Sequence, residues 1–180
     1  EDNPSIRRKV RLASMHLNLG ANDLWRYRFD EAKTEFETSL TFVRQNTRNH
    51  AVITELLFYS LFYAGKLDEA ETILESIVES KNIDQGDFRR AVRNYLLACV
   101  SFAKGDFRRV TSRLSESHHI GQDKEGWNVG SRVLEIMLAI ERKNYDFADS
   151  QIVNLRQFMR EGLKGIEIRK RDKLILEVLV

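Results

Sequence analysis

Few side chains in this 180-residue sequence have the types or spacing that chemistry requires. Cys99 is the single cysteine and lies in an apolar helical stretch, which predicts a buried, unreactive thiol. His118 and His119, with Asp123 nearby, could suggest a metal ion, but adjacent imidazoles rarely converge on one ion and no second Cys/His pair adds ligands. No Gly-rich phosphate loop or serine nucleophile motif occurs. We predict no metal, no cofactor, no catalytic residue and a protein that is not an enzyme.

A cluster of basic residues suggests anion recognition instead. This predicted anionic-partner patch consists of Arg89, Arg90, Arg93, Arg108, Arg109 and Arg113. The preceding segment, residues 66 to 87, is rich in Asp and Glu. Two interpretations remain open: the oppositely charged helices pair with each other, or the arginines bind an acidic protein segment or nucleic acid. Aromatic residues are not interleaved with the arginines as base stacking would require, which argues against nucleic acid.

Composition favours long helices and places few other limits on function. The chain has one proline and nine glycines, and most of the glycines lie between periodic apolar segments. The 29 basic and 27 acidic residues give a net charge of +2, so no global field attracts nucleic acid or membrane. No apolar run reaches the length of about 18 residues typical of a membrane span. The single cysteine favours a reducing, cytoplasmic location. Because the chain starts at Glu1, we expect a piece of a longer protein.

Four stretches share one pattern: a small or polar turn, an apolar anchor, and a small residue three positions after the anchor. The anchors are 38, 40 and 38 residues apart: Phe29, Leu67, Phe107 and Tyr145. Gly65, Gly105 and Asn144 are predicted to adopt a left-handed conformation that ends one helix. Each anchor is predicted to fill the space beneath its turn. The small residues Ala32, Ala70, Val110 and Ala148 then allow two antiparallel helices to cross closely, and large residues four positions further on pack between pairs: Phe36, Leu74, Leu114 and Ile152.

Apolar residues at three- to four-residue spacing predict an all-α chain of nine helices. Four antiparallel pairs are expected in one domain over residues 1–180, at 5–46, 47–82, 87–118 and 125–162. A last apolar helix is predicted over residues 166–180. A single pair cannot bury both of its apolar faces, so the pairs are expected to stack as a repeat array.

The chain resembles the tetratricopeptide repeat at these turns. The resemblance rests on the Gly-Lys-Leu-Asp-Glu-Ala run at residues 65–70 and on its echoes at 28–29, 105–107 and 144–145. It implies a right-handed α-solenoid with degenerate repeats. The repeat period of 38–40 residues exceeds the family's period of about 34. The Trp-Leu-Gly-Tyr run of the family leaves only Leu19-Gly20 as a trace, and the terminal proline is missing. A plain helical bundle remains the alternative.

The resemblance implies that the first helix of each pair lines a concave, apolar and aromatic groove. The groove residues predicted by register are Glu55, Tyr59, Phe62, Tyr63, Tyr95, Cys99, Phe102 and Met137. Such a surface suits a peptide or an amphipathic helix. The same residues could instead be core, or could be covered by the last helix, and these interpretations stay open. Tyr and Leu stand where the family's carboxylate clamp needs Lys and Asn, so that use is not expected.

The sequence therefore predicts a non-enzymatic protein–protein interaction module that binds a peptide or partner protein in the groove. The alternative is a structural or regulatory segment of a larger protein, which forms a homodimer or packs neighbouring domains through its last helix. The apolar residues from Leu174 to Val180 support the alternative.

Overall fold

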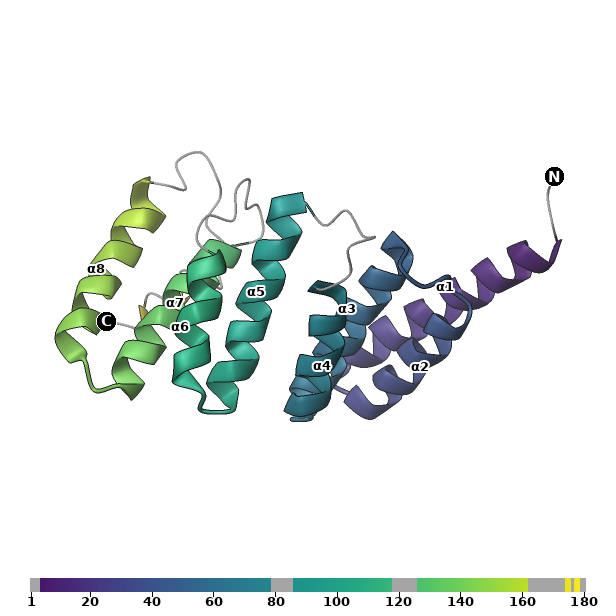
Figure 1. Cartoon of the computed structure of the whole chain (residues 1–180), viewed down its shortest axis with the longest axis horizontal. Helices are drawn as coiled ribbons and strands as arrows, with labels where there is room; N and C mark the ends of the chain where they lie inside the picture. Colours follow the sequence, from purple (N-terminus) through teal and green to yellow (C-terminus); the bar gives the residue numbers. More distant parts are fainter. Residues whose placement is uncertain (1–3, 79–85, 118–125, 162–173, 176, 179–180) are drawn as a thin grey trace. The chain divides into compact units, whose positions relative to one another are not determined.

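The computed structural model describes residues 4–78, 86–117, 126–161, 174, 175, 177 and 178. Helices are the only regular structure within those ranges, which contain no strand. The eight helices are α1 (Pro4–Trp25), α2 (Phe29–Thr41), α3 (Arg48–Tyr63), α4 (Leu67–Val78), α5 (Gly86–Ala103), α6 (Phe107–Ser117), α7 (Trp127–Glu141) and α8 (Tyr145–Glu161). Consecutive helices pack in antiparallel pairs (Figure 1). The prediction of an all-α chain with four helix pairs is confirmed.

Part of the ninth predicted helix lies outside the described residues. Of residues 166–180, the structure describes Leu174, Ile175, Glu177 and Val178, which are helical. His118, His119 and Asp123 also lie outside the described residues.

The chain divides into two compact units, Glu1–Gln85 and Gly86–Val180. We call them the N-terminal unit, which contains α1–α4, and the C-terminal unit, which contains α5–α8. The division falls between the second and third predicted repeats, so each unit holds two helix pairs.

One turn geometry closes all four pairs. The residue two positions before each anchor has a positive φ, of 60° at Tyr27, 76° at Gly65, 76° at Gly105 and 58° at Lys143. The amide of the following residue donates to a carbonyl five positions back, at 2.9 Å in all four turns. This is the Schellman arrangement, which satisfies carbonyls at the end of a helix.

The predictions for the glycine turns are confirmed, but the prediction for the fourth turn is wrong by one residue. Lys143, not Asn144, adopts the left-handed conformation. The Asn144 side chain instead accepts a hydrogen bond from the Phe147 amide at 3.4 Å, at the start of α8. Because an asparagine side chain can cap a helix start, Asn144 serves α8 rather than the end of α7.

The small crossing residues are buried as predicted: Ala32, Ala70, Val110 and Ala148. Phe36, Leu74 and Leu114 are also buried, and Ile152 is half-buried. The anchor prediction is wrong at Tyr145, whose side chain is 60% exposed. Phe107 packs against Phe102, with ring centroids 5.7 Å apart. The residue of α7 that matches Phe102 in the repeat is Ile140, which is itself exposed, so Tyr145 remains at the surface.

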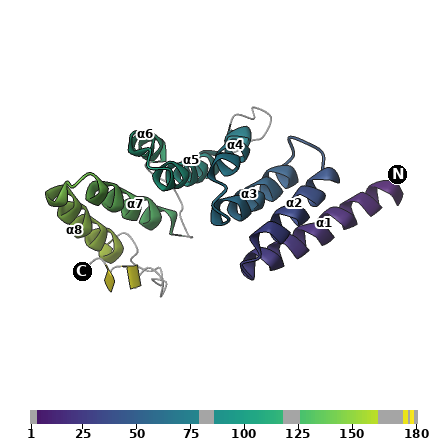
Figure 2. The same cartoon turned by 90° about the horizontal axis from the view of Figure 1, so that it is seen from below.

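In the N-terminal unit, α2 packs against both α1 and α3 (Figure 2). A glycine allows the close approach of α1 and α2, because a β-carbon on Gly20 would lie 2.7 Å from a ring carbon of Phe36. The buried hydroxyl of Ser39 donates to the Ala13 carbonyl at 2.8 Å, which places the last turn of α2 beside Ala13. α2 is therefore enclosed between α1 and α3, and α1 continues past the end of α2 (Figure 2).

The C-terminal unit divides its core between two clusters. One cluster joins α5, α6 and α7 through Ala98, Val110, Leu114, Leu134 and Leu138. The other joins α7 and α8 through Val129, Ile136, Leu155 and Met159. α7 contributes to both clusters and therefore holds this unit together.

Candidate functional site

A surface cluster of aromatic rings lies where the α1–α2 turn meets the end of α3. Phe29, the first residue of α2, stacks on Tyr63, the last residue of α3, with centroids 5.7 Å apart. Tyr27 meets Phe29 edge-on at 6.2 Å, and Tyr59 stacks on Tyr63 at 6.4 Å. Phe62 meets Tyr63 at 5.6 Å. We call these five residues the aromatic cluster.

The aromatic cluster exposes large apolar side chains. Tyr27 is 81% exposed and Tyr63 58% exposed, and the neighbouring Trp25 is 83% exposed. A few scattered apolar residues at a surface are ordinary, but grouped aromatic side chains mark interaction sites on many proteins. Trp and Tyr also contribute disproportionately to the free energy of protein association.

The backbone at Tyr27 is strained. Its φ of 60° lies in the left-handed region, which costs a non-glycine residue on the order of 1–2 kcal/mol. The turns at Gly65 and Gly105 avoid that cost because glycine has no β-carbon. An exposed tyrosine recovers little of the cost through burial. Lys143 shares this strain at the end of α7, so the feature particular to Tyr27 is that a strained turn carries an exposed aromatic side chain.

Ion pairs hold the elements beside the cluster. Arg28 pairs with Asp23 across the α1–α2 turn. The Lys66 amino group contacts Asp30 at 2.6 Å, and Lys33 contacts Glu69 at 2.8 Å, which links α2 to the start of α4. The hydrogen bond from Lys66 lowers the pKa of Asp30, and the hydrogen bond from Lys33 lowers the pKa of Glu69. These pairs are solvated, so they orient α2 and α4 more than they stabilise them.

The structure brings together three of the predicted groove residues in the N-terminal unit. Tyr59, Phe62 and Tyr63 belong to the aromatic cluster, with Tyr63 exposed and the other two half-buried. Glu55 lies one turn before Tyr59 on α3 and is half-buried. Sequence reasoning missed Trp25, Tyr27 and Phe29 as site residues. The available signal was their alternation at the α1–α2 turn, beside the repeat anchor.

In the C-terminal unit, the matching residues pack between helices. Tyr95, Cys99 and Phe102 are half-buried against the core cluster that α5, α6 and α7 share. A β-carbon on Gly130 of α7 would lie 2.6 Å from the Tyr95 hydroxyl oxygen, so the tyrosine covers that glycine. Tyr95 also meets Trp127 edge-on at 6.0 Å. Met137 is exposed on α7. These contacts favour the interpretation that Tyr95, Cys99 and Phe102 belong to the core of the C-terminal unit over the interpretation that they line an open groove.

Cys99 has the environment of an inert thiol. Burial raises its pKa to about 11, against the opposing effect of a hydrogen bond with Tyr95. At neutral pH the side chain is therefore a thiol and not the reactive thiolate.

The predicted anionic-partner patch loses one of its six members to the interior. Arg93 is 1% exposed and lies in the interior of the C-terminal unit, which removes it from the patch. It falls on the side of α5 that also carries the buried Leu97 and Val100, four and seven residues further on, a position that its charge concealed in the sequence. Arg90 pairs with Asp87, and the Arg109 side chain lies 4.0 Å from Asp106. The remaining members are the exposed Arg108 and the half-buried Arg89 and Arg113.

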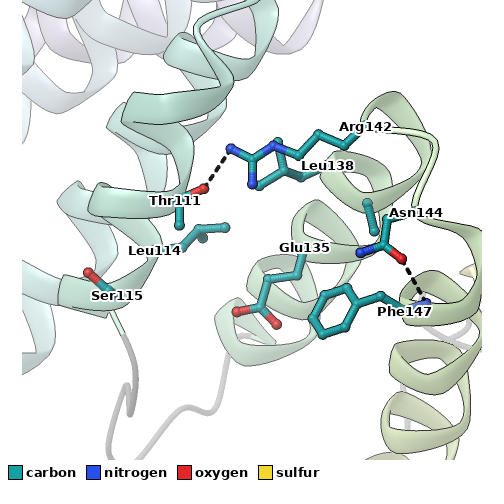
Figure 3. A pocket seen from close by; sticks show the side chains of 9 residues that line it. Thr111, Leu114, Ser115, Glu135, Leu138, Arg142, Asn144 and Phe147 are labelled. Atoms are coloured by element: carbon teal, nitrogen blue, oxygen red, sulfur yellow. Dashed lines mark hydrogen bonds between the residues drawn. The ribbon is translucent and has the colours of Figure 1, made fainter.

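A cleft of about 320 Å³ opens between α6, α7 and the start of α8 in the C-terminal unit, beside the core cluster that joins α6 to α7 (Figure 3). Leu114 and Leu138 line it, with Phe147 on the α8 side. Arg142 bridges the cleft: its guanidinium donates to the Phe107 carbonyl at 2.6 Å and to the Thr111 hydroxyl at 2.9 Å. The sequence did not predict this cleft, because the same residue types would line a closed interface.

The residues that the structure describes contain neither a metal-binding cluster nor a membrane-spanning helix. In those ranges, no group of three His, Cys, Asp or Glu side chains is placed to hold a metal ion. Every helix in the same ranges is too short or too polar to cross a membrane. Comparisons with protein-family models, curated protein sequences and solved structures found no match.

Proposed function

We propose that this protein is a protein-interaction module and that its N-terminal unit binds a segment of a partner protein at the aromatic cluster. The observation that carries the proposal is Tyr27, an exposed tyrosine held at a φ of 60° beside Phe29 and Tyr63. An exposed aromatic side chain on a strained turn lowers stability without adding to the core. Binding of a partner would compensate for both costs by burying the rings.

We further propose that the helix pairs are degenerate tetratricopeptide-like repeats of a right-handed solenoid. The support is the recurrence of one turn, with positive φ at Tyr27, Gly65, Gly105 and Lys143, and of a buried small residue five positions after each. Repeats of this kind present the first helix of each pair to a ligand, which is the helix that carries Tyr59 and Tyr63.

Replacement of Tyr27 by glycine separates recognition from folding. Glycine relieves the strain of the turn, so Tyr27→Gly is expected to leave the fold intact and to raise its stability by up to about 1 kcal/mol. The same change removes the exposed ring. The full chain and its Tyr27→Gly and Tyr63→Ser variants would be used to capture proteins from lysate, with quantitative mass spectrometry of the captured set.

Tyr145→Ser is the matched control, because Tyr145 is also a surface tyrosine near a pair turn but lies outside the aromatic cluster. The proposal predicts that the same proteins are lost from both cluster variants and retained by Tyr145→Ser. Equal capture by wild type, Tyr27→Gly and Tyr63→Ser would refute it.

A second proposal is homodimerisation through the last helix. Leu174 and Val178 are exposed, and they lie four residues apart, on one side of a helix. Light scattering over a range of protein concentrations should show a mass that rises toward the dimer. A mass that stays at the monomer value, or a dimer that persists in Leu174→Asp/Val178→Asp, would exclude this role.

A further inference from the structure

The first turns of α1 extend beyond the end of α2. The Ser39–Ala13 hydrogen bond places the last turn of α2 beside Ala13. All residues from Pro4 to Arg11 are exposed, and both views show α1 continuing past α2 (Figures 1 and 2). Ile6 is 61% exposed and Val10 58% exposed. We call residues 4–11 the α1 overhang.

A cleft of about 400 Å³ opens at the base of the α1 overhang. Its apolar lining includes Val10 and Leu17 of α1, Phe42 and Val43 after α2, and Val52 of α3. Arg44 and Arg48 also line it, from the segment that joins α2 to α3 and from the start of α3. The cleft thus combines apolar side chains with two guanidinium groups.

The two chain segments that form most of this cleft are basic and contain no acid. Residues 4–22 and 38–54 contain no Asp or Glu. The same two segments contain six Arg or Lys residues: Arg7, Arg8, Lys9, Arg11, Arg44 and Arg48. Glu35, an acid of the neighbouring α2, is engaged by His16 at 2.7 Å. A chain of nearly balanced total charge has therefore concentrated positive charge at one end of the N-terminal unit.

We propose that this cleft binds an acidic amphipathic segment of a partner protein. Apolar side chains of the segment would occupy the cleft, and its carboxylates would face Arg44, Arg48 and the α1 overhang. The inference rests on the proposed function of the N-terminal unit and states which chemistry the partner must have.

The cleft and the aromatic cluster lie on the same side of α3. Val52 and Tyr59 are seven residues apart, which is nearly two full turns of a helix. Val52 lies in the first half of α3 and Tyr63 at its end. One bound segment therefore runs along α3 for about 24 Å, the length of a 16-residue helix. Its acidic part lies at the α1 overhang and its apolar part at the aromatic cluster.

Nucleic acid and anionic membrane are the competing ligands for a basic surface. Each would need the charges alone, because a phosphate backbone or a lipid headgroup layer offers no apolar side chain to fill the cleft. The apolar lining at Val10, Leu17 and Val52 favours a peptide.

The test uses the full chain and three fluorescein-labelled 16-residue synthetic peptides in fluorescence anisotropy. The first peptide carries leucine at helical i, i+3 and i+4 spacing with glutamate elsewhere. The second is a scrambled sequence of the same composition, and the third has lysine in place of each glutamate. We expect the acidic amphipathic peptide to bind at least tenfold more tightly than the other two, with an affinity that falls as salt is added.

Two variants test the two features of the cleft. Arg44→Glu/Arg48→Glu reverses the charge and should weaken binding of the acidic peptide at least tenfold. Val10→Asp places a carboxylate among the apolar side chains and should weaken it as well. Arg156→Glu, a charge reversal on an exposed position of α8, is the control and should leave affinity unchanged. Circular dichroism verifies that each variant is folded.

Three results would overturn the inference: equal binding of the scrambled peptide, affinity that is unchanged in Arg44→Glu/Arg48→Glu, or tighter binding of a 16-base-pair DNA duplex or of phosphatidylserine vesicles than of the acidic peptide. The two proposals also fail separately. If the acidic peptide binds but Tyr27→Gly and Tyr63→Ser capture the same proteins as the wild type, only the proposal for the aromatic cluster is refuted. If protein capture depends on the two tyrosines but Arg44→Glu/Arg48→Glu leaves the affinity for the acidic peptide unchanged, only the inference of an acidic segment is refuted.

Discussion

In the N-terminal unit α2 packs along α3 and the Lys33 side chain of α2 contacts Glu69 of α4, whereas in the C-terminal unit α6 meets α7 at a smaller core cluster with an open cleft beside it. Both units use the same turn and the same small crossing residues. What differs is how one pair meets the next. The shared motif therefore builds a helix pair, and the contacts between pairs are set by other residues.

Matched leucines measure this difference directly. Leu74 and Leu114 occupy the same repeat position, and both are buried. Leu114 lines the cleft, so its truncation removes fewer contacts. We expect Leu74→Ala to lower the free energy of unfolding by about 4 kcal/mol and Leu114→Ala to lower it by about 2 kcal/mol. These values lie near the upper and lower ends of the range that is usual for this substitution in a core. Hydrogen exchange in α4 and α6 measures both, and equal costs would mean that the cleft does not loosen the packing.

Two glycines test how rigid the helix crossings are. Gly20→Ala forces a methyl group against the buried Phe36 ring, and the strain should exceed the gain in helix propensity, for a net loss of about 1–2 kcal/mol. Gly130→Ala meets the outer end of the half-buried Tyr95, which can move aside. We expect its net effect to be within about 0.5 kcal/mol of zero. Urea denaturation checks both, and the reverse order would contradict the assignment of the tighter crossing to the N-terminal unit.

Substitutions at the turns of the first and third helix pairs are expected to change stability in opposite directions. Tyr27→Gly should stabilise the N-terminal unit by up to about 1 kcal/mol, since glycine adopts a positive φ without strain. Gly105→Ala should destabilise the C-terminal unit by about 1 kcal/mol for the same reason. Thermal melts of both variants provide the measurement. Destabilisation by Tyr27→Gly would show that the Tyr27–Phe29 contact outweighs the backbone strain.

Arg142 tests whether a single side chain maintains the cleft. Arg142→Ala removes both hydrogen bonds to α6 and should cost about 1 kcal/mol, because the guanidinium is exposed. Faster hydrogen exchange is expected in α6 and not in α2. Arg156→Ala serves as the control, and matching exchange in the two variants would exclude a bridging role.

The smallest expected effect is on the rate at which the Cys99 thiol is labelled, and stability is not involved. Because its pKa is raised to about 11, the thiolate fraction stays low at pH 8 and rises only as pH approaches 11. Labelling with a maleimide at pH 8 should be slow compared with a cysteine introduced at the exposed Ser112 of α6. Equal labelling rates would instead place Cys99 in an open groove.

The helix pairs were predictable because their signals are local. Spacings of 38, 40 and 38 residues located all four turns, and Gly65 and Gly105 marked two of them correctly. The third signal failed at Asn144, since an asparagine can equally end one helix or cap the next. The first turn, at Tyr27, carried no glycine to mark it. Its left-handed residue became visible only with backbone angles.

The candidate sites were less predictable, because they depend on neighbours distant in sequence. Tyr59 and Cys99 share one repeat position, yet Tyr59 joins an exposed aromatic cluster and Cys99 packs against the core of its unit. Arg93 carries a charge typical of a surface but is buried. The basic cleft near Arg44 and Arg48 combines two segments about 30 residues apart that look unremarkable singly.

The sequence by itself determined the eight described helices and their pairing, because helical periodicity and turn chemistry act within a few residues. The tertiary structure alone decided which apolar side chains became core and which remained on the surface. Burial depends on how closely the next helix approaches, and here Gly20 and the bridge from Arg142 set that distance. Tyr27 shows both contributions: its repeat spacing predicts a turn, and only the fold reveals a strained, exposed ring beside Phe29 and Tyr63.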